Sequence, residues 1–372
     1  MVGLTGDAAW YRQRILENLT TTSDRYDLTY LFEMAGLLAE AGDADARVAM
    51  YARFADHAVA APAAHDAHQI GAEALVRLDG FRGLLFVAER LTARPEPDDG
   101  WFGQSLLRLA REKDGDEAVD HGLARARAGS LRRAAYFDEA ARVGSQSPPP
   151  RPRGIQDLTY DELRARIATE PSRLVIGSGY WGKRADDASV TRAARDLAGE
   201  TDPARFLAYV GIFRQRAFPL DPAPLLAAAH GTDEKLAHYA FLALSQLRHP
   251  DVRRLALSTF ADPARSHLAV ALLERNYAPG DHLPIERALV GARDDDNLHR
   301  LGSFVLRVFE ANLVPEATGP LTALYETGPC ATCRERCFDL LKQIGALPDW
   351  MVRESAYDAN FDLRQKARAL LL

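Results

Sequence analysis

The sequence predicts an all-α fold, an α-solenoid of antiparallel helix pairs, and three observations support this prediction. Apolar residues recur at three- and four-residue spacing along almost the whole chain, as in Leu28, Leu31, Phe32 and Ala35, which is the pattern of amphipathic helices. Strand patterns are nearly absent, because residues 173–181 form the only short β-like run and have no obvious partner strand. Weak internal similarity between segments favours a repeat array over a globular bundle.

The first eight helices form an N-terminal helical repeat region, residues 1–143. They are expected near residues 8–19, 27–41, 44–59, 64–78, 82–93, 101–112, 115–127 and 129–143. The stretch "GSQSPPPRPRG" then interrupts the pattern, because consecutive prolines supply no amide donors for a helix and favour an extended chain. Residues 144–155 are therefore predicted to be a proline-rich linker or a surface crossover.

A second helical repeat region is predicted over residues 156–372. Its helices are expected near residues 159–168, 187–199, 203–214, 221–229, 232–247, 250–260, 264–274, 283–291, 295–311, 315–326, 329–344, 348–355 and 360–371. The short intervals between them predict antiparallel neighbours, joined by tight turns.

The clearest repeat unit is "EKLAHYAFLALSQLRHPDVRRLALSTF", Glu234 to Phe260. An alanine-rich helix is followed by a turn and by a second helix that opens with Asp251, Val252 and Arg253. Shorter echoes are "GDADARVAMYARF", "GSLRRAAYF" and "NFDLRQKARALL", each with an acidic or capping residue, an arginine about two positions later and then a small residue. Their arginines are Arg47, Arg132 and Arg364.

This pattern resembles the HEAT-repeat family, in particular the short repeats named after bilin lyases. The resemblance is good over 234–260 and partial at 362–372. It implies a right-handed α-solenoid and, for the family, a role in binding other macromolecules. Some HEAT-like families resemble this architecture and act as DNA alkyl-base glycosylases, for which Trp101, Trp181 and Trp350 are the candidate base-stacking residues.

Composition limits the partners and the location that we expect. The chain has 372 residues, of which 47% are hydrophobic and 26% charged, and a net charge of -6. An acidic molecule has no general attraction to nucleic acid or to an anionic membrane, so nucleic acid is a disfavoured partner. The first residues lack the pattern of a signal peptide, and no run of about 18 apolar residues occurs. We therefore expect a cytoplasmic protein without a membrane partner, of undetermined oligomeric state.

All three cysteines of the chain lie in "GPCATCRERC", as Cys330, Cys333 and Cys337. Their spacing suits thiolate ligands for zinc or an iron–sulfur cluster. However, the same spacing places them on one helical stripe that continues through Leu340 and Leu341. Because free cysteine is among the most buried residue types, and no second CxxC or nearby HxxxH completes a ligand set, the favoured interpretation is a core face without a cofactor.

A second candidate site is the glycine-rich segment "IGSGYWGKR", residues 176–184. Glycines beside aromatic and basic residues suit a phosphate-binding loop or a stacking contact, so Tyr180, Trp181, Lys183 and Arg184 are candidate binding residues. The segment matches neither GxxxxGK[ST] nor GxGxxG. The favoured interpretation is a long turn in which glycines adopt positive φ and the two aromatic residues cover a groove between repeats.

Together these patterns favour a non-catalytic scaffold that binds a protein partner on a solenoid surface. Neither GxSxG nor HExxH occurs, which weakens the enzyme hypothesis without excluding distant residues that converge. Two alternatives stay open at this point. One is a nucleic-acid-binding or glycosylase-like protein, and the other is a zinc or iron–sulfur protein that uses the cysteine cluster.

Overall fold

The structure is a computed structural model that describes residues 8–60, 64–93, 101–145, 154–292 and 294–372. Over these residues the chain forms the helices α1 to α22 and contains no strand, so the all-α prediction is confirmed there. In the short β-like run, residues 173–174 and 177–181 are helical and residues 175–176 form a turn. None of the described helices has both the length and the apolar character needed to span a bilayer.

The contacts between residues divide the chain into two units. Unit 1 comprises Met1–Pro149 together with Asp349–Leu372, and unit 2 comprises Pro150–Pro348. The sequence prediction placed 349–372 in the C-terminal repeat region, whereas their contacts are with the N-terminal helices. Residues 146–153 of the predicted linker lie outside the described residues.

Unit 1 contains nine α-helices among its described residues, with connections that include a short 3₁₀-helix at Ala64–Gln69. The helices are α1 (Ala8–Thr21), α2 (Arg25–Glu40), α3 (Ala44–Ala60), α4 (Ala72–Leu91), α5 (Trp101–Asp114), α6 (Asp116–Gly129), α7 (Leu131–Ser145), α21 (Asp349–Ser355) and α22 (Phe361–Leu371). The break predicted between two helices near residue 80 is a kink inside α4. Gly80 has a φ of 55° there, which a residue with a side chain rarely adopts.

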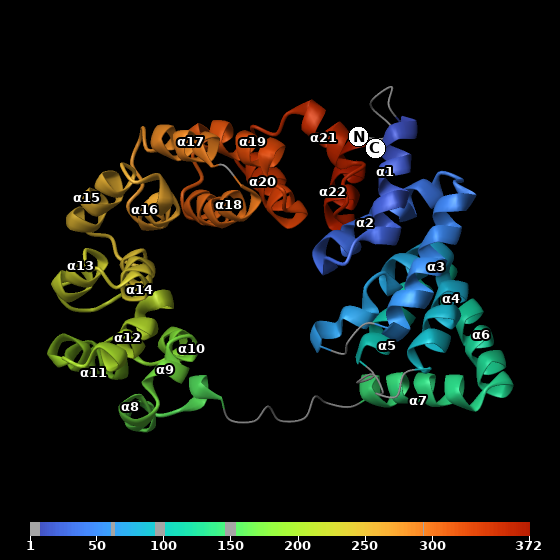
Figure 1. The fold of residues 1–372 in the computed structure, drawn as a ribbon, viewed down its shortest axis with the longest axis horizontal. Coiled ribbons are helices and arrows are strands. Elements are labelled where there is room, and N and C mark those ends of the chain that lie inside the picture. Colours follow the sequence, from blue (N-terminus) through green and yellow to red (C-terminus); the bar gives the residue numbers. More distant parts are fainter. Residues whose placement is uncertain (1–7, 61–63, 94–100, 146–153, 293) are drawn as a thin grey trace. The chain divides into compact units, whose positions relative to one another are not determined.

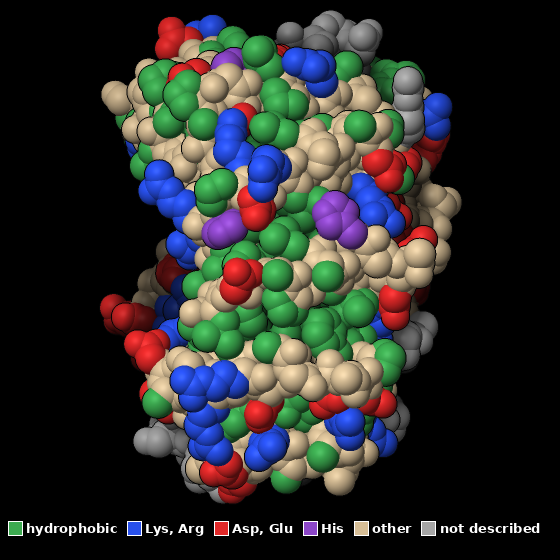
Figure 2. All heavy atoms as spheres, turned by 90° about the vertical axis from the view of Figure 1, so that its left-hand side faces the viewer, with side chains coloured by type: hydrophobic (Ala, Val, Ile, Leu, Met, Phe, Trp, Pro, Cys, Tyr) green, Lys and Arg blue, Asp and Glu red, His purple; other side chains and the backbone are tan. Residues whose placement is uncertain are grey.

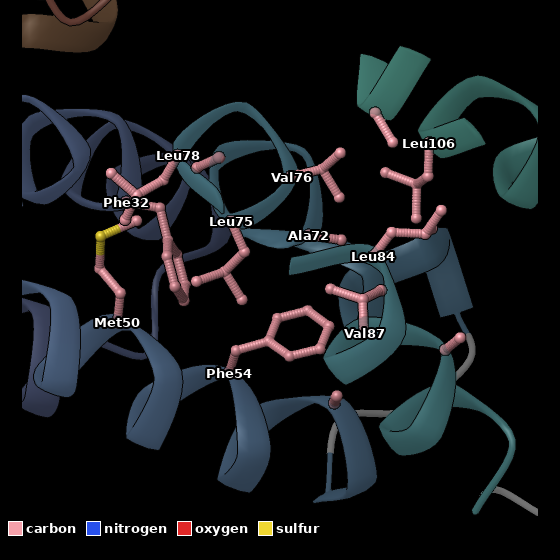
Figure 3. Close-up of a cluster of buried hydrophobic side chains, with 14 of the residues drawn as sticks. Phe32, Met50, Phe54, Ala72, Leu75, Val76, Leu78, Leu84, Val87 and Leu106 are labelled. Carbon is pink, nitrogen blue, oxygen red and sulfur yellow. The ribbon is translucent and has the colours of Figure 1, made fainter. Parts of the chain in front are cut away.

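The core of unit 1 is formed by large apolar side chains from successive helices (Figure 3). Phe32 of α2, Phe54 of α3 and Leu75 of α4 are each 0% exposed and point toward one another. Leu84 and Leu106 extend the cluster toward α5. These side chains occupy the apolar stripes that the sequence spacing predicted, because burying such a stripe is what stabilises an amphipathic helix.

The C-terminal helix α22 joins unit 1 through a buried arginine. Arg364 is 5% exposed and donates from Nη2 to Glu33 Oε2 of α2 over 2.8 Å. Arg77 of α4 donates to the other oxygen of Glu33, also over 2.8 Å, and its guanidinium lies over the ring of Phe361. Two arginines thus share one carboxylate, an arrangement that is costly to break because it would leave a buried charge without its partner.

Unit 2 is a succession of shorter helices (Figure 1). They are α8 (Tyr160–Thr169), α9 (Pro171–Leu174), α10 (Gly177–Arg184), α11 (Asp187–Gly199), α12 (Pro203–Ile212), α13 (Ala223–Ala229), α14 (Glu234–Leu244), α15 (Pro250–Thr259), α16 (Ser266–Leu273), α17 (His282–Gly291), α18 (Asp295–Ala311), α19 (Thr318–Thr327) and α20 (Ala331–Gln343). Helices α12, α14, α16, α18 and α20 follow one another along one side, each in contact with the next, while α11, α13, α15, α17 and α19 lie along the other.

One arginine of the best-matching repeat connects α15 to the following helices. Arg253 donates from Nη2 to Asp281 Oδ1 over 2.9 Å and from Nη1 to the carbonyl oxygen of Asn276 over 2.7 Å. The Asp281 carboxylate is nearly buried, and it also accepts a hydrogen bond from the amide of Ala278. A buried carboxylate needs such partners, so this contact fixes the connection before α17.

Candidate functional site

The glycine-rich candidate segment is a helix and not a turn. Residues Gly177–Arg184 form α10, and none of its glycines has a positive φ. Gly179 and Gly182 pack closely against α12, and Gly177 packs against Ile155. A Cβ added at Gly182 would lie 2.1 Å from the carbonyl oxygen of Ile212, and one at Gly211 would lie 2.5 Å from the Val175 carbonyl oxygen. The prediction of a long turn was wrong, because glycine can serve either a turn or a close helix contact.

The four candidate binding residues of this segment divide between the two faces of α10. Trp181 is 3% exposed and donates from Nε1 to the carbonyl oxygen of Leu158 over 2.8 Å, so it is a core residue and not a stacking surface. Tyr180, Lys183 and Arg184 are exposed. Arg184 forms a long ion pair of 3.6 Å with Asp157.

The other two tryptophans considered for base stacking belong to unit 1. Trp101 is 42% exposed at the start of α5, and Trp350 is 36% exposed in α21. Trp181 lies in unit 2 and is buried, so the three do not form one aromatic surface within a single unit.

The cysteine stretch forms the first turns of α20 and approaches a histidine of α18. Cys330 is the N-cap residue of α20 and is half-buried, while Cys333 lies in the first turn and is 5% exposed. The Sγ atom of Cys333 is 3.7 Å from Nδ1 of His299. One ligand atom from each of these three residues lies within 4.8 Å of the others. We refer to Cys330, Cys333 and His299 as the thiol–imidazole cluster.

The two thiols of the cluster have different acidities. The pKa of Cys330 is lowered to about 5, first by the hydrogen bond from the Cys333 side chain and then by the amides of Cys333 and Thr332 and by His299, against the effect of burial. The partial positive charge of a helix N-terminus favours a thiolate in the same way. The pKa of Cys333 is raised by its hydrogen bond to Cys330 and by burial. A thiolate at Cys330 beside a neutral thiol at Cys333 is the favoured state.

Cys337 lies outside the cluster. It is 0% exposed, one turn further along α20, and burial raises the pKa of its thiol to about 12. Its neighbours in α20 are the buried Phe338 and Leu341. The structure therefore separates the three cysteines, which were favoured as a core face and considered as metal ligands: Cys337 lies in the core, and Cys330 and Cys333 lie next to an imidazole.

Sequence reasoning missed His299, which is 34 residues before Cys333. It lies in the segment "ARDDDNLHR", whose aspartates begin α18, and Asp294 is the N-cap that accepts from the amide of Asn297. A signal was nevertheless present. His299 precedes the buried Gly302 by three residues, so it lies at the border of the buried stripe of α18.

A second feature of unit 2 is a cleft of about 340 Å³ between α16, α17 and α18. Its walls are mainly apolar and include Phe260, Ala288 and Leu301, and Arg287 lies at its edge. Beside the cleft, α17 exposes Leu283 and Val290, which are 49% and 76% exposed. The exposed guanidinium of Arg287 has no ion-pair partner among the described residues.

The cleft also contains a buried imidazole. His267 of α16 is 8% exposed, and its pKa is lowered to about 4 by burial, with further contributions from the charge of Arg300 and from His238. His267 is therefore neutral at physiological pH. Its ring lies 6.2 Å from that of Phe304, so it functions as part of the apolar wall.

Another apolar surface lies on the outer side of unit 2. Figure 2 shows hydrophobic side chains gathered near the middle of this face, at the height of α13 in Figure 1. Helix α13 contains no charged residue, and Leu220 just before it is 36% exposed. No residue of α13 lines the cleft beside α17, so this surface is a useful comparison for that cleft.

Comparison of the chain with protein-family models, with curated proteins and with solved structures found no match.

Proposed function

We propose that the protein is a non-catalytic scaffold that binds a segment of a protein partner in the cleft between α16, α17 and α18. One observation carries this proposal: an apolar cleft adjoins exposed apolar side chains and a cation, Arg287, without an ion-pair partner in the described part of the chain. Apolar pockets with few polar groups are typical binding sites. Exposed Leu283 and Val290 would contribute further apolar area around a bound segment.

A HEAT-like solenoid is the fold that we propose for this scaffold. Three of the four arginines of the repeat-like segments support it, because Arg47, Arg253 and Arg364 each pair with a carboxylate outside their own helix. Ion pairs between neighbouring repeats also recur at similar separations. Arg47 and Asp79 are 32 residues apart, and Arg253 and Asp281 are 28 apart. A regular separation is expected when each unit contacts the next.

The partner segment that fits the cleft is an amphipathic peptide with one large apolar side chain and a nearby carboxylate. The apolar side chain would replace water against Ala288 and Leu301, and burial of such a group is the main source of affinity. The carboxylate would pair with Arg287 at the rim, which contributes more to specificity than to affinity.

A displayed library of random peptides, selected on the full-length protein, tests this function. We expect enriched peptides that combine an apolar anchor with an acidic residue. Ala288→Glu should abolish their binding, because it places a carboxylate in the apolar wall. Arg287→Ala should weaken binding by about two- to fivefold. Leu220→Glu, at an exposed apolar residue just before α13 that does not line the cleft, is the matched control and should leave binding unchanged.

Two results would overturn the proposal. One is a selection that enriches no peptide above background. The other is a set of peptides that bind Ala288→Glu as tightly as the wild-type protein. A gel-shift at low salt with duplex and single-stranded DNA addresses the nucleic-acid alternative, and for a scaffold that binds proteins we expect no shift.

A cytoplasmic location is part of the same proposal. It is supported by the state of the cysteines, all three of which are free thiols. A reducing compartment maintains such thiols.

A further inference from the structure

The first turn of α20 and the first turns of α18 bring together three side chains that suit a soft divalent metal. Cys330 and Cys333 provide two sulfur atoms and His299 provides an imidazole nitrogen, all within 4.8 Å of one another. The three residues come from two helices that pack together, so their proximity depends on the core of unit 2. We propose that the thiol–imidazole cluster binds one Zn²⁺ ion with an open fourth position.

The distances suit zinc. With Zn–S bonds of about 2.3 Å and Zn–N bonds of about 2.0–2.1 Å, a tetrahedral ion separates its ligand atoms by about 3.5–3.8 Å. The Sγ atom of Cys333 and Nδ1 of His299 are already 3.7 Å apart. Small side-chain rotations at the half-buried Cys330 and the exposed His299 would complete the arrangement.

The ligand types also select among metals. Two thiolates and an imidazole favour zinc over the oxygen-seeking magnesium and calcium ions. An iron–sulfur cluster uses four thiolates in its common forms, whereas this cluster provides two. Cys337 cannot supply the third thiolate, because it is buried one turn away and is not within the cluster.

The fourth position faces solvent. Three protein ligands and one exchangeable ligand are the coordination of catalytic zinc sites, whereas structural sites have four protein ligands. His299 is exposed and Cys330 is half-buried, so water or a small anion can reach the ion from their side. The neighbouring Arg336 forms an ion pair with Glu310, and Arg334 donates to the carbonyl oxygen of Gly328.

Titration with Co²⁺, followed by displacement with Zn²⁺, tests this site in the full-length protein. The protein is reduced with a phosphine, stripped with a chelator and dialysed before the titration. We expect one Co²⁺ per chain, thiolate-to-cobalt charge-transfer absorption and the intense visible bands of a tetrahedral ion. One equivalent of Zn²⁺ should remove these bands. Added imidazole should shift them by entering the fourth position, and a spectrum that imidazole leaves unchanged contradicts an open position.

Single variants identify the ligands. Cys330→Ser should eliminate or halve the charge-transfer absorption of the stoichiometric Co²⁺ complex. It should also weaken Zn²⁺ binding by at least about tenfold, because loss of a residue that only supports a ligand already lowers metal affinity by about 10–100-fold. His299→Ala should weaken binding to a similar extent and retain absorption from two thiolates. Both residues lie at the surface side of the cluster, so their variants should fold normally. Cys337→Ala is the matched control and should bind as the wild-type protein does.

Three outcomes would overturn the proposal. The first is a reduced protein that shows no charge-transfer absorption with Co²⁺. The second is Zn²⁺ binding that survives Cys330→Ser but is lost in Cys337→Ala. The third is a Cys330–Cys333 disulfide that forms in air while the reduced protein takes up no metal, which would identify a redox-active thiol pair instead.

Discussion

The two segments that the sequence singled out, Gly177–Arg184 and Gly328–Cys337, both lie in unit 2 but differ in what their distinctive residues do. In the first, the glycines allow α10 to touch the backbone of α12, and Trp181 is buried. In the second, the cysteines divide between the core and a cluster with His299.

This difference shows that a residue type suggests several roles and that position on the helix selects one. Gly179 and Gly182 lie inside the packed helix α10, so their lack of a side chain permits contact with α12. Cys330 lies at the end of α20, where the helix meets solvent and has free amide groups. Cys337, seven residues later, meets only the core.

The largest effect is expected at the contact between α10 and α12. Gly182→Ala would place a Cβ 2.1 Å from the backbone oxygen of Ile212, which cannot move away as a flexible side chain would. We expect a loss of at least about 3 kcal/mol in the free energy of unfolding. Because Trp181 is the one tryptophan of unit 2, its fluorescence during urea unfolding reports on this unit when the other tryptophans are replaced by phenylalanine.

Gly199→Ala is the matched control for this substitution. Gly199 ends α11, and a Cβ there would meet no atom within 4 Å. Its unfolding free energy should change by less than about 0.5 kcal/mol. Equal stability of the two variants would contradict the role assigned to the glycines of α10.

The next largest effect concerns the buried imidazole of His267, in contrast to the exposed His299. The pKa of His267 in the folded state is about 4, below the ordinary 6.5. Neutral His267 therefore makes its full contribution to the free energy of unfolding above pH 6.5, and this contribution is lost as the pH falls toward 4. The loss amounts to about 3 kcal/mol. His267→Gln should therefore show a shallower decline of unfolding free energy over this interval than the wild-type protein. His238 and Arg300, which face the ring, remain in both proteins. If the free energy of unfolding declined equally in both proteins, His267 would not take up a proton on unfolding in this pH interval.

A smaller effect on the free energy of unfolding is expected for the cysteines of α20, and it should differ between Cys337 and Cys330. Cys337→Ser buries a hydroxyl in the core, and we expect a loss of about 1–3 kcal/mol in metal-free protein. Cys330→Ser affects a half-buried helix end and should cost less than about 1 kcal/mol. Urea unfolding in the presence of a chelator measures both. A greater loss of unfolding free energy for Cys330→Ser than for Cys337→Ser would contradict the assignment of Cys337 to the core and Cys330 to the surface.

The smallest effect is expected on the exposed side of α10. Tyr180→Ala removes a side chain that is 55% exposed, so the unfolding free energy should change by about 0.5 kcal/mol or less. The same urea experiment measures it. A loss as large as that of Gly182→Ala would mean that Tyr180 packs against the fold in solution.

Helical periodicity was sufficient to predict most helices, because burial of an apolar stripe dominates their stability. It was not sufficient for Gly177–Arg184, whose packing depends on the contact with α12, nor for the unit to which the correctly predicted helix α22 belongs. Arg364 belongs to a segment with repeat character, yet its partner Glu33 is 331 residues away. Likewise, two ligands of the thiol–imidazole cluster are local in sequence, but His299 is placed by the packing of α18 on α20. Contacts between distant helices leave no periodic signal.

Thiol accessibility tests most directly the claim that Cys330 and Cys333 form a metal site while Cys337 belongs to the core. The reduced, metal-free protein is treated with iodoacetamide near neutral pH, and the labelled peptides are followed by mass spectrometry with and without Zn²⁺. We predict rapid labelling of Cys330, slow labelling of Cys333 and labelling of Cys337 only after unfolding, with Zn²⁺ protecting Cys330. Labelling of Cys337 as fast as Cys330, or labelling of Cys330 that Zn²⁺ does not slow, would contradict the claim.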